Sequence, residues 1–96
     1  MLAARPWYAS DAVRHFTTAD FWHLYNALPL DVRRLADKNY DLLQADPAHP
    51  SLQFKEVAGL WSVRVGLHYR AVAYQDGDHL FWFWFGSHAE YDKIVS

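Results

Sequence analysis

Residues 54–91, FKEVAGLWSVRVGLHYRAVAYQDGDHLFWFWFGSHAEY, decide the fold of this chain. Short apolar runs separated by turn sequences are typical of an antiparallel meander. We expect strands over 53–57, 60–66, 69–75 and 80–85. The run 80–85 is apolar throughout, which predicts a strand covered on both faces. Gly86 then breaks the pattern, and a short helix is predicted over 88–95.

The turns between these strands have recognisable sequences. Ala58-Gly59 and Leu67-His68 each leave only two residues between strands, and Asp76-Gly77-Asp78 is a strong hairpin signal because glycine tolerates positive φ. Within a strand, successive side chains point to opposite faces. Trp61 and Val63 therefore share one face with the core, and Arg64 projects from the other.

Two helices are predicted before the sheet. Thr17 or Thr18 caps the first, whose apolar residues recur at helical spacing up to Pro29. The second carries an apolar stripe with a charged opposite side and closes at Asp46-Pro47. Residues 12–16 alternate like a short edge strand, and residues 1–10, with Pro6, Trp7 and Tyr8, resemble an N-terminal arm.

The fold class that follows is α+β. An N-terminal αα-hairpin packs on a four- to five-stranded antiparallel sheet, and a short C-terminal helix follows. The whole chain of 96 residues is expected to form a single domain, 1–96. The face of the sheet that the hairpin leaves uncovered is where a polar site is expected.

The amino-acid composition limits the classes of function that this chain can have. Hydrophobic residues make up 52% of the chain and aromatic residues 18%, which argues against disorder. The absence of cysteine excludes disulfides, thiolate nucleophiles and sulfur-based zinc sites. No run is apolar enough for a signal or a membrane span, and we expect a cytoplasmic protein with no membrane partner. The net charge of −2 means that nucleic-acid binding would rest on a local patch.

The candidate patch consists of Arg64, Arg70 and Lys55. The tight turn at Leu67-His68 brings Arg64 and Arg70 alongside each other on neighbouring strands. Two adjacent guanidiniums repel unless an anion bridges them, and their planar donor forks suit phosphate oxygens. Simple surface charge is the alternative for each arginine. Lys55, on the preceding strand, adds a third cation, although a lysine alone usually just faces solvent.

His88 and Tyr91 are the candidate proton-transfer groups. His88 follows Gly86-Ser87 at the exit of the most apolar strand, and histidine moves protons near neutral pH. A cap or a hydrogen bond at the edge of the core is the structural alternative for His88. Tyr91 lies three residues on, on the same side of the predicted helix, where packing is the more common role. No cofactor or metal site is expected, because the remaining histidines are scattered.

The order of these features resembles the RelE/ParE superfamily of toxins from type II toxin–antitoxin pairs. The resemblance spans about residues 16–94 and rests on LP-x-D-V (28–32), D-P (46–47), HPSL-x-FK (49–55), WSVRVGLHYRAV (61–72) and FGSHAEYDKI (85–94). It implies a helix hairpin on an antiparallel sheet and a cognate antitoxin as partner. RelE-like members cleave mRNA on the ribosome without a metal, whereas ParE-like members inhibit DNA gyrase by binding it.

The resemblance also implies roles for particular residues. Arg70 matches the arginine of the family's Y-R strand, and Arg64 matches a basic position on the strand before it. Ser62 stands where some RelE-like members have a lysine. His88 matches the C-terminal catalytic position, and Tyr91 approximates a family tyrosine. The leading hypothesis is therefore a ribosome-dependent endoribonuclease with mRNA as substrate. The alternatives are a gyrase inhibitor and an inactive relative that binds only an antitoxin.

Overall fold

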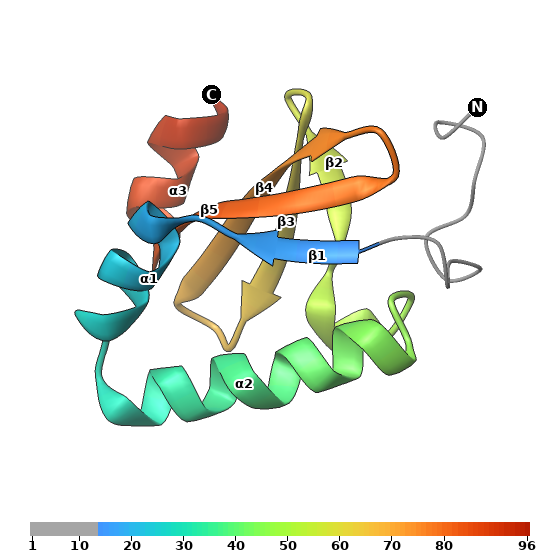
Figure 1. The fold of residues 1–96 in the computed structure, drawn as a ribbon. Coiled ribbons are helices and arrows are strands. Elements are labelled where there is room, and N and C mark those ends of the chain that lie inside the picture. The colour runs from blue at the N-terminus through green and yellow to red at the C-terminus, as the bar shows by residue number, and fades with distance from the viewer. Residues whose placement is uncertain (1–13) are drawn as a thin grey trace.

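The computed structural model describes residues 14–96, which form a five-stranded sheet with helices on both faces (Figure 1). The strand order is β1-β5-β4-β3-β2. The strands are β1 (Arg14–Thr17), β2 (Lys55–Val57), β3 (Leu60–Val65), β4 (Tyr69–Asp76) and β5 (His79–Ser87). The helices are α1 (Ala19–Asn26), α2 (Leu30–Ala45) and α3 (His88–Val95), with a short 3-10 turn at Pro50–Leu52.

Local sequence explains where the helices begin and end. The Thr18 side chain accepts a hydrogen bond from the Phe21 N–H and so caps α1. Pro29 separates α1 from α2, and α2 ends at Ala45 with Asp46 as its C-cap, close to the predicted end at Asp46-Pro47. Ser87 and Glu90 form a capping box at the start of α3, which satisfies two backbone donors at that terminus.

The turns predicted at Ala58-Gly59 and Asp76-Gly77-Asp78 are confirmed, whereas the link between Val65 and Tyr69 has three residues (66–68) rather than the predicted two. Ala58 and Gly59 both have positive φ, +54° and +81°, in the two-residue link between β2 and β3. Gly77 has φ +61° in the β4–β5 hairpin, where Asp76 pairs with His79. These tight links make β2 to β5 a continuous antiparallel meander.

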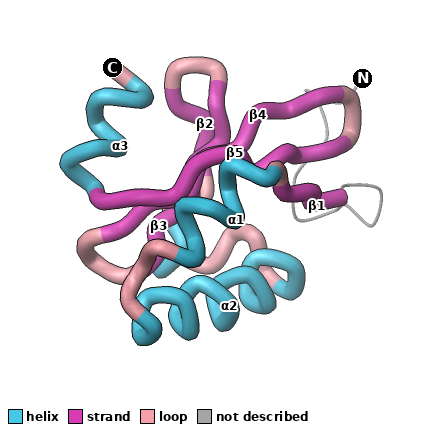
Figure 2. The backbone as a smooth tube through the Cα atoms, turned by 60° about the vertical axis from the view of Figure 1, so that its left-hand side comes forward, coloured by secondary structure: helices cyan, strands magenta, loops and turns pink. Residues whose placement is uncertain are grey.

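The αα-hairpin covers one face of the sheet (Figures 1 and 2). The core on this inner face consists of buried residues from α2, the 3-10 turn and the sheet, against which the apolar side of α1 packs. Its buried members are Leu43, Leu52, Val63, Val65, Ala71, Ala73, Leu80, Trp82 and Phe85. On the outer face, α3 buries Tyr91 against Ser62, so that a second, smaller contact forms there.

Three findings go beyond the sequence prediction. The α+β class is confirmed, but β1 pairs in parallel with β5, so the sheet is mixed rather than wholly antiparallel. The expectation that β5 is covered on both faces was wrong, because Phe81 and Phe83 on its outer side are only half-buried. The predicted arm at residues 1–10 lies outside the described residues. Among the described helices, none is long and apolar enough to cross a membrane.

Candidate functional site

Arg64 and Arg70 lie directly opposite each other on the outer face of the sheet. They are register partners on β3 and β4, so their side chains leave the sheet on the same side. Both are half-buried. The Arg64 Nε donates to the Ser51 carbonyl at 3.3 Å, which holds that guanidinium near the turn before β2. The sequence prediction that the turn would bring the two arginines together is confirmed.

Two neighbours hold the Arg70 guanidinium. One Nη donates to the Tyr69 carbonyl at 3.0 Å, and the guanidinium carbon lies 5.7 Å from the centre of the Tyr91 ring, within cation–π range. Burial lowers the pKa of Arg70, and the Arg64 charge lowers it further, whereas Tyr91 and Asp92 oppose this shift. The guanidinium stays charged at neutral pH, but it lacks part of its hydration and lies beside a like charge.

The buried Tyr91 ring is the support against which the Arg70 guanidinium packs. Only 6% of Tyr91 and 1% of Ser62 is exposed, and the Tyr91 hydroxyl donates to the Ser62 Oγ at 3.0 Å. A phenol that is buried and bonded in this way is poorly placed to give a proton to a substrate. The structure therefore places Tyr91 in a packing role, as the support on which Arg70 lies, rather than at the open surface.

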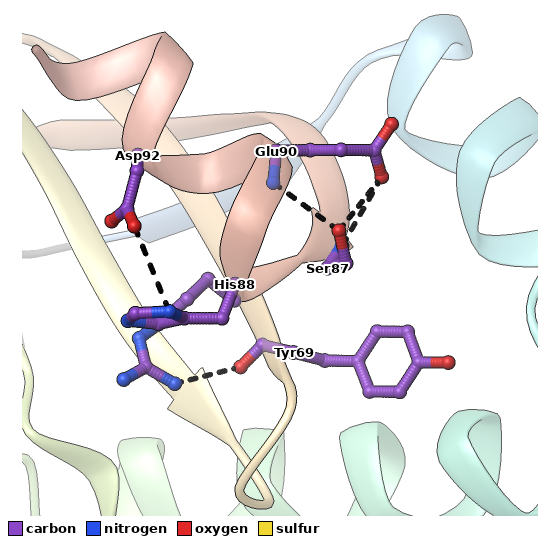
Figure 3. Close-up of polar contacts among 6 residues, drawn as sticks. Tyr69, Ser87, His88, Glu90 and Asp92 are labelled. Carbon is purple, nitrogen blue, oxygen red and sulfur yellow. Dashed lines mark hydrogen bonds and ion pairs between the residues drawn. The ribbon is translucent and has the colours of Figure 1, made fainter.

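His88 stands at the open side of the same group. Its backbone N–H donates to the His68 carbonyl at 2.8 Å, which ties the first turn of α3 to the β3–β4 turn. Its ring lies 5.9 Å from that of Tyr91, and its Nδ1 is 3.8 Å from an Asp92 oxygen (Figure 3). The side chain remains 49% exposed, so a substrate can reach the imidazole.

Lys55 lies on the same face, at its edge. It pairs with Ser62 across β2 and β3, and Ser62 is two residues before Arg64 on the same side of β3. Lys55 is exposed. The sheet thus places Lys55, Arg64 and Arg70 on one open face, with His88 beside them at the start of α3.

Two members of this site escaped sequence reasoning. Asp92, next to His88 and Arg70, is marked in the sequence only by its i,i+4 spacing from His88. Ser62 resembled a lost basic position, but it is the buried partner of the Tyr91 hydroxyl. Within residues 14–96, no group of three histidine or acidic side chains is arranged to hold a metal ion. The two guanidiniums can bind an anion, and the His88 imidazole can transfer a proton.

Comparison with known proteins identifies the family. Residues 30–93 match the ParE-like toxin domain, which is most of the chain and includes every site residue named above. The chain belongs to this family. It is thus a toxin domain of the RelE/ParE superfamily, as the sequence motifs predicted. Among curated proteins, none matches the chain.

Solved structures share the fold of this toxin domain. RelE in the RelB–RelE complex of Methanococcus jannaschii aligns with a TM-score of 0.65 and 14% identity, over 84% of this chain and 99% of that one. The archaeal RelE–RelB complex of Pyrococcus horikoshii gives 0.63 and 16%, over 78% and 93%. The RelBE2 toxin–antitoxin complex of Mycobacterium tuberculosis gives 0.55 and 21%, over 80% and 90%. At these identities the likeness concerns the fold alone.

Proposed function

We propose that this toxin domain is a metal-independent, ribosome-dependent endoribonuclease that cleaves mRNA and so inhibits translation. One observation carries the proposal: Arg64 and Arg70 face each other on an open sheet face, with the accessible imidazole of His88 beside them. Two opposed guanidiniums form a site for a doubly contacted phosphate, and the imidazole supplies the proton-transfer group that strand cleavage needs.

The reaction is transesterification within the RNA. The ribose 2′-oxygen attacks the adjacent phosphorus, a new P–O bond forms, and the bond to the 5′-oxygen of the next nucleotide breaks. Arg64 and Arg70 stabilise the extra negative charge on the phosphorane, with Lys55 assisting from the edge. His88 makes one of the two proton transfers, either from the 2′-hydroxyl as base or to the 5′-oxygen as acid, and water makes the other. The Tyr91 hydroxyl takes no part, because it is bonded to Ser62.

The partners follow from the same proposal. The substrate mRNA is met on the ribosome, and a cognate antitoxin binds and silences the toxin in the cell. RelE is seen with RelB in both archaeal structures that share this fold. The accessible position of His88 and Lys55 fits a site that a macromolecule covers.

The test is translation-coupled mRNA cleavage in a reconstituted system. Wild type is compared with Arg70→Ala and His88→Ala, and cleavage sites are mapped by primer extension. Loss of one electrostatic stabiliser lowers a reaction rate about 10²–10³-fold, so the cleavage rate of Arg70→Ala should be lower than that of wild type by this factor. Arg34→Ala and His23→Ala are matched controls, because both side chains are exposed on the helices of the hairpin. Both controls should cleave like wild type.

A gyrase supercoiling assay run beside it tests the competing activity. If wild type inhibits supercoiling and leaves mRNA intact, the domain is a gyrase inhibitor and the nuclease proposal fails. If wild type cleaves mRNA but Arg70→Ala and His88→Ala cleave equally well, the domain is a nuclease and the assigned site is wrong.

A further inference from the structure

The outer face of the sheet carries a second feature that the cleavage chemistry does not use. Phe16, Tyr74, His79, Phe81 and Phe83 form a group of rings across β1, β5 and β4, which we name the aromatic strip. Phe16 is 40% exposed and Tyr74 is 42% exposed. Phe81 and Phe83 are half-buried, although they belong to the most apolar strand of the chain.

The rings of the strip are stacked in the direction that crosses the strands. Phe81 is the register partner of Phe16 on one side and of Tyr74 on the other. The ring centres lie 5.0 and 5.2 Å apart, with planes inclined by only 16° and 14°. These separations match the spacing of neighbouring strands, about 4.8 Å. Because β1 is the edge strand of the sheet formed by residues 14–96, the stack within these residues ends at Phe16.

The strip shares its sheet face with the two arginines. Tyr74 lies four residues after Arg70 on β4, on the same side, which corresponds to about 13 Å along the strand. Between them lies Trp84, whose indole covers Gly86, the register partner of Arg70. Half-buried and exposed rings therefore lead from the arginine pair toward the free edge at Phe16.

We propose that the aromatic strip is a base-stacking platform for the single-stranded RNA that flanks the phosphate held by Arg64 and Arg70. The inference rests on the proposed nuclease function and adds a second contact region to it. Aromatic side chains bind single strands of any sequence, because every base offers a π-face that stacks on a ring. Because the rings turn their faces toward one another, a base would stack at the end of the run, on Phe16 at the edge strand, which is 40% exposed. A strand whose phosphate lies between the arginines would then run along the strip to that edge.

The composition of the strip favours RNA over a protein partner. All five side chains carry rings, and none is aliphatic. In two successive pairs the rings are nearly parallel and stacked, as in a run of stacked bases. Arg14 and Asp76, on the same face at its far end, offset each other in charge, so phosphate attraction comes from the arginine pair. The rings would then supply stacking, and the arginines the electrostatic attraction.

Binding of uncleavable RNA separates the strip from the catalytic site. One probe is a 2′-O-methyl dinucleotide, which reaches only the arginine pair. The other is a longer 2′-O-methyl single strand that carries the same dinucleotide at one end. Phe16→Ala and Tyr74→Ala should weaken binding of the longer strand about 5- to 100-fold and leave dinucleotide binding unchanged. Phe16→Tyr and Tyr74→Phe keep the rings and should bind like wild type.

Tyr40→Ala is the matched control, because Tyr40 is 41% exposed on α2, which lies on the opposite face of the sheet. The proposal is overturned if the wild type shows no gain in affinity for the longer strand. It is equally overturned if the strip variants bind that strand normally and instead lose self-association or binding of a protein partner. Because the probes cannot be cleaved, the binding assay tests the stacking proposal, and the mRNA cleavage assay tests the nuclease proposal separately.

Discussion

Replacing Tyr91 by phenylalanine tests how the site is held together. The change removes one oxygen and keeps the ring beneath Arg70. It takes away the hydrogen bond to Ser62, which joins residues 29 positions apart and links α3 to β3. Ser62 is only 1% exposed, so its hydroxyl would lose this partner where water does not easily replace it. We expect a loss of about 1–3 kcal/mol in the free energy of unfolding.

The measurement is urea and thermal unfolding followed by circular dichroism. For a domain of this size each kcal/mol shifts Tm by roughly 4–8 °C, so the change lies well within reach. Ser62→Ala and the double variant complete a thermodynamic cycle. A coupling energy of about 0.5–3 kcal/mol between Tyr91 and Ser62 is expected. If the two single changes add to within about 0.5 kcal/mol, the hydrogen bond does not contribute as reasoned.

The same variant separates packing from chemistry. If Tyr91 supports Arg70 through its ring, Tyr91→Phe should cleave mRNA at the wild-type rate in its folded temperature range. Tyr91→Leu, which removes the ring, should lower cleavage because the Arg70 guanidinium loses its cation–π contact. A fall of orders of magnitude in folded Tyr91→Phe would mean that the hydroxyl transfers a proton, contrary to the structure.

Two further predictions concern His15 on the inner face and the glycines of two turns. Burial lowers the pKa of His15 from 6.5, and its Nδ1 accepts from the Trp82 indole at 3.1 Å, so the folded state favours neutral His15. As pH drops below about 6.5, the unfolded chain takes up a proton on His15 before the folded chain does, so the free energy of unfolding should fall. Urea unfolding across this pH range should show this dependence of the free energy of unfolding on pH, and His15→Phe should reduce it. Gly66→Ala should destabilise more than Gly77→Ala, although both have positive φ, +66° and +61°. A Cβ at Gly66 would lie 2.9 Å from the Leu35 side chain, whereas one at Gly77 meets nothing within 4 Å. The free energies of unfolding of the two variants, measured in parallel denaturation curves, should therefore differ by roughly 1 kcal/mol, the low end of overpacking costs.

Much of the fold was predictable because its determinants are local. Alternation along β3 and β4, together with the glycine turns, set which residues point inward and which outward. The parallel pairing of β1 with β5 was not predictable, because a four-residue strand carries no signal for its partner or direction. The outer side of β5 was predicted as covered because an unbroken apolar run has no period. Such a run cannot show that Phe81 and Phe83 face an open surface.

The candidate site divides in the same way. The proximity of Arg64 and Arg70 follows from strand alternation and one short turn, both legible in the sequence. The bond between Tyr91 and Ser62 depends on how α3 rotates against a strand 29 residues earlier, and no local pattern encodes that angle. The S-x-x-E spacing at Ser87 and Glu90 was a readable signal for the start of α3. It bears indirectly on His88, which is the first residue of that helix.

The register between β3 and β4 sets like charges opposite each other where the sheet gains nothing from them. Like charges directly opposite on neighbouring strands are destabilising, and partial burial of Arg70 adds a desolvation cost. The Tyr91 ring and the Tyr69 carbonyl offset part of this cost and fix the direction of one guanidinium. A phosphate between the arginines would relieve the repulsion and replace the missing hydration together. An arrangement that is unfavourable when empty and favourable around an anion is what a phosphate site requires, and a sheet selected for stability alone would avoid it.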